Sequence, residues 1–312
     1  MSRYVEAALP SLDDSFETLS YHAKTIWLFT RSDLKTIVIP STFFGLLAAY
    51  SGPPLMTSTL TLSSILLRTP YVLLWVWSTL LPFNINNQCH PDSIAEDRFN
   101  KPWRPMPGNR IAPKHAITLM CILYVVNLAI GFQLGAVRQS VALLLLGIWY
   151  NRLGGADRSC MEKNFINGAG YVSFITGALS VAANTPRTLV TTAAIAVPWF
   201  TIIGATIFTT VHMQDLEDQE GDAARGRWTV PLVLGDAVAR YIIAVAVPAW
   251  SVFTPFFMKS RVSGFVLPNL LAAVVAFRVL RYRYKEEDRA TFIIWNMWIL
   301  SIYAIPLSVV VS

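Results

Sequence analysis

The sequence has little charge for its length. Only 14% of its 312 residues are Asp, Glu, Lys or Arg, against about 25% in average soluble domains. So few charged side chains do not cover the surface of a water-soluble globule of this size. The three cysteines, Cys89, Cys121 and Cys160, are too few and too widely spaced for a disulfide scaffold. The zinc spacings HExxH and CxxC are absent, as are the GxxxxGK[ST] and GxSxG motifs.

Apolar residues make up most of the remainder: 54% of the chain is hydrophobic and the mean hydropathy is +0.47. A helix that crosses a bilayer needs roughly 20 mostly apolar residues, and helices satisfy their own backbone groups in hydrocarbon. Nine stretches are candidates: about 35–56, 69–86, 113–134, 138–151, 165–184, 188–211, 237–258, 262–280 and 290–311. The sequence therefore predicts an all-α polytopic membrane bundle. Residues 1–34 form a cytosolic segment, and 35–312 form a single transmembrane domain.

The basic residues indicate how such a bundle is oriented. With nine spans, four fifths of the 25 Lys and Arg residues fall on one side of the membrane. The positive-inside rule then places the N-terminus in the cytosol. All 19 Asp and Glu residues fall on the same side. The rule does not predict this second bias, which needs its own explanation.

Many of the acidic residues lie in two clusters within cytosolic loops, and the first cluster spans 87–97. On a helix, Gln88, Asp92 and Glu96 recur every four residues and share one face. Carboxylates on one face repel one another unless a cation holds them. Oxygen ligands beside basic residues suit Mg²⁺, which keeps coordination positions for substrate phosphates. The spacing therefore predicts ligands for a magnesium ion.

The second cluster spans 214–222, and it places Asp215, Asp218 and Asp222 on one helical face. A single acidic run in a loop is typical of a solvated surface. Two runs at helical spacing, each followed by a segment with Pro and Arg, favour metal binding instead. Acidic faces and basic residues together at the mouth of a membrane bundle suit a lipid diphosphate.

The second cluster also carries a resemblance to a known family. The run DLEDQEGD at 215–222, followed by Gly226, Thr229, Pro231 and Gly235, resembles the DxEDxEGD…G…TLPxxxG segment of the UbiA superfamily of intramembrane prenyltransferases. The resemblance extends over essentially the whole chain. It implies a helical bundle around a cavity, with Mg²⁺ as cofactor and an isoprenyl diphosphate as substrate.

The first cluster departs from the family pattern, NxxxDxxxD followed by NxPxRP. Alignment on Asn100 puts Asp97 at the last aspartate and leaves Ser93 and Cys89 at the other two ligand positions. Alignment on the four-residue period keeps the three ligands that share a helical face. We favour the second register, with Asp97 as an additional metal ligand, because a hydroxyl and a thiol are poor magnesium ligands.

Basic and polar residues elsewhere complete the expected site. The resemblance implies that Tyr150, Lys163 and Asn164 face the cavity near the diphosphate. Arg104 and Arg225 are further candidates for binding diphosphate oxygens, since arginine makes bidentate contacts. Lys163 has an alternative interpretation as a positive-inside anchor.

The stretch 96–107, together with the segment 31–40, is most similar to the fungal UbiA-type terpene cyclases. This resemblance implies that the protein ionises farnesyl or geranylgeranyl diphosphate and cyclises the resulting cation in terpenoid biosynthesis. Asp92, Glu96, Asp215 and Asp218 would be catalytic. The partners it implies are the isoprenyl diphosphate and membrane lipid, with no nucleic acid, and it identifies no protein partner. In a eukaryote it implies the endoplasmic reticulum membrane.

Aromatic residues near the spans are candidates to stabilise that cation through their ring faces. They are Phe43, Trp149, Tyr150, Tyr171 and Trp199. Packing against neighbours or lipid is the more common role of such residues.

Two other functions stay open. A prenyltransferase would combine the same metal clusters with a pocket for an aromatic or lipid acceptor. A transporter would also bury acidic residues within a bundle, but the acids here lie on one side of the membrane, which disfavours an ion path across it.

Overall fold

The structure is a computed structural model that describes residues 12–184 and 194–309. Within these ranges the secondary structure is helical, and the β contact present is an isolated bridge between Ser260 and Val309. The prediction of an all-α fold is confirmed. Residues 1–11, 188–193 and 310–311, which belong to the expected N-terminal segment and to the sixth and ninth expected spans, lie outside the described residues.

Thirteen α-helices and four shorter helical turns make up the described part of the chain. The α-helices are α1 (Leu12–Thr30), α2 (Ile39–Ser51), α3 (Leu62–Gln88), α4 (Pro91–Asn100), α5 (Pro113–Leu134), α6 (Val137–Asn151), α7 (Cys160–Ala183), α8 (Ala196–Thr210), α9 (Gln219–Arg225), α10 (Val230–Leu234), α11 (Asp236–Phe257), α12 (Ser263–Arg281) and α13 (Lys285–Tyr303). Shorter turns are η1 (Arg31–Asp33), η2 (Leu34–Val38), η3 (Val211–Asp215) and η4 (Ile305–Ser308).

Seven helical stretches of the described chain are long and apolar enough to cross a membrane. Two of the nine expected spans fall short of that standard. Helix α6 has 15 residues, or about 22 Å at 1.5 Å per residue. Helix α13 begins with five charged residues at 285–289. The membrane bundle is confirmed, whereas the count of nine is not.

The first span begins earlier than expected. Helix α1, the turns η1 and η2, and helix α2 form one continuous helical stretch, and the candidate membrane span lies within residues Glu17–Ser51 of it. The turn Leu34–Val38 is π-helical. Residue 35, the expected start of the span, therefore lies inside a helix that continues towards the N-terminus.

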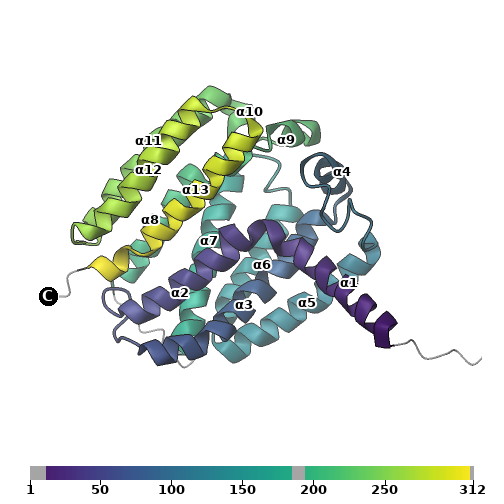
Figure 1. Ribbon diagram of the computed structural model, residues 1–312, viewed down its shortest axis with the longest axis horizontal. Helices are drawn as coiled ribbons and strands as arrows, with labels where there is room; N and C mark the ends of the chain where they lie inside the picture. Colours follow the sequence, from purple (N-terminus) through teal and green to yellow (C-terminus); the bar gives the residue numbers. More distant parts are fainter. Residues whose placement is uncertain (1–11, 185–193, 310–312) are drawn as a thin grey trace, which may run out of the picture.

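The long helices lie side by side, with α11 and α12 forming a hairpin at one edge and α5 running along the other (Figure 1). Helices α2 and α7 pack closely because Gly45 has no side chain. A Cβ atom there would lie 2.6 Å from the carbonyl carbon of Ala178. Many large apolar side chains of α5, α11 and α12 are exposed. Such surfaces suit contact with lipid.

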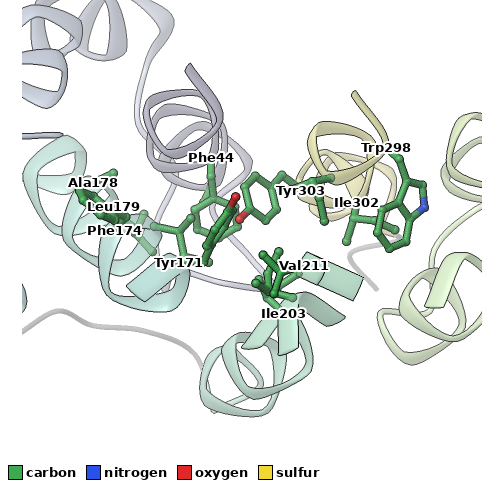
Figure 2. Packing of buried hydrophobic residues seen from close by; sticks show 14 of the residues in the cluster. Phe44, Tyr171, Phe174, Ala178, Leu179, Ile203, Val211, Trp298, Ile302 and Tyr303 are labelled. Carbon is green, nitrogen blue, oxygen red and sulfur yellow. The ribbon is translucent and has the colours of Figure 1, made fainter. Parts of the chain in front are cut away.

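Aromatic side chains fill the centre of the bundle. Phe44 of α2 lies between Tyr171 of α7 and Tyr303 of α13, and Trp298 packs further along α13 (Figure 2). The Phe44 and Tyr303 rings meet edge to face with centroids 5.1 Å apart. This packing joins the first span to α7 and α13, the helices that also carry charged residues of the site described below.

Candidate active site

One cavity of about 650 Å³ lies among the N-terminal stretch, α3, α4, α6, α7, α9, η3 and α13. Its wall has a charged end and an apolar end. The acidic lining residues are Asp33, Glu96, Asp97, Asp215, Glu217, Asp218 and Asp222. The basic ones are Arg31, Lys35, Lys101, Arg104, Lys163, Arg225, Arg227 and Arg289.

The first cluster is divided between two helices. Helix α3 ends at Gln88, and α4 begins at Pro91, a favoured first residue of a helix because proline has no N–H to leave unpaired. Gln88 turns away and donates from Nε2 to the carbonyl of Phe29. The expectation that Gln88 shares a helical face with Asp92 and Glu96 is wrong, because the helix is not continuous between them. Of these three, Glu96 lines the cavity.

Helix α4 turns a different face to the cavity from the one expected. Ser93, Asp97 and Asn100 line the cavity, at intervals of four and three residues. The Asp92 side chain is 68% exposed, and its Oδ2 atom lies 3.4 Å from Nδ1 of His90. Arg104 donates two hydrogen bonds to Asp97, at 2.8 and 2.9 Å. The geometry therefore favours the register aligned on Asn100, with Glu96 as an additional carboxylate.

The second cluster places all three expected aspartates in the cavity wall. Asp215 ends η3, Asp218 is the residue that immediately precedes α9, and Asp222 lies within α9. They converge although a single regular helix does not carry them. A Cβ atom on Gly221 would overlap the Nδ2 atom of Asn100. The two clusters therefore meet directly, with α9 packed against α4.

Lysines hold two of these aspartates. Lys163 of α7 donates to Asp215 Oδ1 at 2.6 Å, and both side chains are 3% exposed. Lys101 donates to Asp218 Oδ2 at 3.0 Å. Burial opposes ionisation of Asp218, but the charge and hydrogen bond of Lys101, together with the charges of Arg104 and Lys163, lower the pKa of the carboxyl group. Burial opposes protonation of Lys101, but the charges of Asp218 and Asp97 and the hydrogen bond to Asp218 together raise the pKa of the amine.

Two arginines that follow the second cluster connect it to the first. Arg225 donates to Glu96 at 3.1 Å. Arg227 donates to Glu96 at 3.3 Å and to Asp222 at 3.0 Å. Both also reach Asp157, in the loop before α7. The carboxylates of the two clusters are thus bridged by cations, not left to repel one another.

Five cations of the cavity wall were not among the expected site residues. Two of them, Lys101 and Arg227, follow the acidic clusters closely in sequence, which is the signal that could have identified them. Arg289 starts α13. Arg31 and Lys35 lie in the N-terminal stretch, and within the described residues neither forms an ion pair. Their spacing of four residues is visible in the sequence, but their approach to the cavity depends on tertiary packing.

The apolar end of the cavity is rich in aromatic side chains. The lining residues there include Phe83, Tyr171 and Phe174, whereas Tyr150 lies nearer the charges of Lys163 and Arg227. Among the aromatic residues considered from sequence, Tyr150 and Tyr171 line the cavity, and Phe43, Trp149 and Trp199 do not. Asn164 also lies outside the lining, where its side chain donates to the carbonyl of Phe208.

The donor set suits a hard divalent cation. Carboxylate oxygens gather at one end of the cavity, and the Oδ2 atom of Asp215 is buried without a hydrogen-bond partner. Oxygen ligands of this kind are those that Mg²⁺ prefers. Within 12–184 and 194–309 no three acidic, His or Cys side chains form a ready metal cluster. Here the carboxylates are paired with lysines and arginines. These ion pairs would have to open before the carboxylate oxygens could bind a metal ion.

Residues 38–302 match the model of the UbiA prenyltransferase family. The chain belongs to this family. It is 29% identical over 287 residues to the fumagillin beta-trans-bergamotene synthase of Aspergillus fumigatus, covering 91% of this chain and 92% of the relative. It is 27% identical to the polyprenyl transferase eriF of Hericium erinaceus, covering 90% and 93%.

A solved structure shares the fold. The UbiA homologue from Archaeoglobus fulgidus bound to GPP and Mg²⁺ superposes with a TM-score of 0.63 at 14% identity, covering 91% of this chain and all of that one. The apolar helices and the family membership identify an integral membrane protein. The protein is an enzyme of the terpene synthase or prenyltransferase type.

Proposed function

We propose that the protein is a magnesium-dependent membrane terpene cyclase that acts on farnesyl or geranylgeranyl diphosphate. The observation that carries this proposal is the two-ended cavity, which joins paired acids and bases to an aromatic wall. An isoprenyl diphosphate has the same division, with two phosphates at one end and an apolar chain at the other. Similarity to a bergamotene synthase over 91% of the chain supports the cyclase reaction.

The charged end would bind the diphosphate. Asp97, Asp215 and Asp218 are the carboxylates that we assign as metal ligands, with Glu96 and Asp222 beside them. We prefer Asp97 to Gln88 and Asp92 because it faces the cavity. A bound Mg²⁺ supplies Lewis-acid stabilisation of the negative charge that develops on the leaving group.

The same end holds cations that can change partner. Lys101, Arg104 and Lys163 donate to aspartates of the cavity wall. If those carboxylates held Mg²⁺, the three cations would be free to donate to phosphate oxygens instead. The negative charge of the diphosphate would then balance the positive charge of these three side chains.

The apolar end would control the cation. The bond between C1 and the phosphate oxygen breaks, its electron pair leaves with the diphosphate, and a double bond of the same chain attacks the allylic cation to close a ring. Loss of a proton ends the reaction. The ring faces of Phe83, Tyr171 and Phe174 can stabilise the positive charge, by about 0.5–2 kcal/mol each. Exclusion of water from the cavity prevents water from reacting with the cation to form a linear alcohol.

The orientation follows from the same charges. The acidic clusters and the basic residues that bind them belong to the loops that the positive-inside rule assigns to the cytosol. The charged end of the cavity would then face the cytosol, where a soluble diphosphate is available, with the N-terminus on that side. In a eukaryote the endoplasmic reticulum is the membrane that we propose.

A prenyltransferase is the second candidate, since the family bears that name and a polyprenyl transferase is 27% identical to the chain. In that reaction the cation is captured by a separate acceptor and not by a double bond of the same chain. The charged end of the cavity would have the same role in both reactions.

An assay without an added acceptor distinguishes the cyclase from the prenyltransferase. Membranes that contain the protein are incubated with Mg²⁺ and farnesyl or geranylgeranyl diphosphate, and the organic extract is analysed for hydrocarbons. We expect a cyclic hydrocarbon, which should be absent when Asp218→Asn replaces the wild type. Product formation that requires an added aromatic or lipid acceptor would instead establish the transferase. Intact diphosphate under both conditions would exclude both reactions for these substrates.

A further inference from the structure

Helix α7 forms a continuous wall from the charged end of the cavity to the apolar end. Lys163, Asn167, Gly170 and Phe174 are separated by four, three and four residues, so they lie on one face of the helix. All four line the cavity. Lys163 donates to Asp215 at the charged end, and Phe174 packs edge to face on Trp75 in the core. Position along this face therefore measures depth in the cavity.

Gly170 leaves an open space in this wall. A Cβ atom built on Gly170 would meet no heavy atom within 4 Å, apart from the adjoining turns of its own helix. Other glycines of α7 are different. A Cβ atom on Gly168 would lie 2.9 Å from the carbonyl oxygen of Gly204, and one on Gly177 would overlap the Trp75 ring.

Neither helix packing nor backbone conformation explains a glycine at 170. No neighbouring helix occupies the space where a side chain would go, and φ is not positive at this residue. Glycine within a helix also weakens it relative to alanine. The space itself, which belongs to the cavity, is the feature that a side chain at 170 would remove.

The depth of this space can be compared with the substrate. Seven residues separate Gly170 from Lys163, which is about 10 Å along a helix. Four carbon–carbon bonds of about 1.5 Å make an extended isoprene unit roughly 5 Å long. The space at Gly170 therefore lies about two isoprene units from the charged end, and Phe174 lies about one unit deeper.

We propose that Gly170 sets the length of isoprenyl chain that the cavity accepts. A geranyl chain ends at about the depth of Gly170, whereas farnesyl and geranylgeranyl chains must pass this point or fold back beside it. The space lets the longer chains do so. This inference rests on the proposed binding of an isoprenyl diphosphate, but it holds equally for a cyclase and for a transferase.

The test is an affinity measurement on the purified full-length protein in detergent with Mg²⁺. The ligands are the geranyl, farnesyl and geranylgeranyl thiolodiphosphates, in which sulfur replaces the bridging oxygen and slows ionisation. We expect Gly170→Leu to weaken farnesyl and geranylgeranyl binding at least tenfold and to change geranyl binding less than twofold. Gly170→Ala should give a smaller loss in the same order. This variant should also fold well, because alanine stabilises a helix relative to glycine.

Two outcomes would overturn the proposal. One is an equal loss of affinity for all three chain lengths, and the other is unchanged affinity for the longer chains in both variants. Ala169→Leu is the matched control, since Ala169 is the preceding residue of α7 and is not part of the cavity wall. It should leave the three affinities unchanged. A wild-type protein that binds none of the three ligands would contradict the proposed function itself, which separates the two failures.

Discussion

The two acidic clusters look equivalent in the sequence but differ in the structure. In the second cluster, every aspartate chosen by helical spacing lies in the cavity wall. In the first, the same reasoning selects one lining residue, Glu96, together with Gln88 and Asp92, which do not line the cavity. In neither cluster does one regular helix carry all the residues, so helical spacing alone does not ensure a common face: the aspartates of the second cluster converge because η3 and α9 both border the cavity, whereas Gln88 and Asp92 lie on either side of the break between α3 and α4.

The clusters also differ in how their carboxylates are balanced. Asp215 is held by a lysine from α7, 52 residues away, and both side chains are almost fully buried. Asp97 is held by Arg104, seven residues along the same segment. We expect the second cluster to contribute both to the stability of the fold and to catalysis. We expect the first cluster to contribute mainly to catalysis.

The largest effect should come from Asp215→Asn. A lost metal ligand removes several kcal/mol of leaving-group stabilisation, and each 1.36 kcal/mol is tenfold in rate, so turnover should fall by about 1,000-fold. The variant leaves the Lys163 ammonium buried without its counter-ion, which destabilises a protein by about 3–5 kcal/mol. Turnover with Mg²⁺ and thermal unfolding in detergent measure the two effects separately.

The double variant Asp215→Asn with Lys163→Met is the control for the buried charge. It should recover much of the thermal stability and none of the turnover. Near-normal turnover in either variant would show that Asp215 is not a ligand.

The next effect distinguishes the two registers of the first cluster. Asp97→Asn should lower turnover by about 100-fold, since it removes a carboxylate from the cavity and frees Arg104 from its partner. Asp92→Asn is the matched control on the same helix and should change turnover less than twofold. A damaging Asp92→Asn with a silent Asp97→Asn would restore the register based on the four-residue period. Turnover is measured against Mg²⁺ concentration for both variants.

A smaller effect should follow from separating the clusters. Gly221→Ala adds a methyl group that overlaps the Asn100 amide, whose oxygen accepts a hydrogen bond from Lys285. Helix α9 must then shift relative to α4, and misplaced catalytic groups lose rate. We expect a loss of about tenfold in turnover with unchanged membrane insertion. Ala224→Ser, on the exposed side of α9, is the control and should behave as the wild type.

The smallest effect should come from Arg289→Gln. Arg289 is half exposed and donates to Glu217 at 2.7 Å at the edge of the cavity. Exposed ion pairs contribute only about 0.2–1 kcal/mol. We expect KM for the diphosphate to rise two- to threefold, with kcat and thermal stability unchanged. A loss comparable to that of Asp97→Asn would mean that Arg289 binds the substrate more directly than its exposure indicates.

Much of the fold could be predicted from apolar runs, because a membrane-crossing helix needs a length that composition reveals. The exceptions have physical causes. Helix α6 is too short to be judged by that length, and the first helical stretch continues towards the N-terminus through residues with charged side chains. Pro91 marks the break in the first cluster and is visible in the sequence as a helix-starting residue.

The sequence by itself determined that this is a helical membrane protein with two carboxylate clusters followed by basic residues, because composition and local spacing are properties of the chain alone. Only the tertiary structure decided which carboxylates face the cavity and which cation holds each one. Lys101 and Asp218 are 117 residues apart, and Arg225 and Glu96 are 129 apart. Such pairs form when helices pack, so no spacing within either segment encodes them.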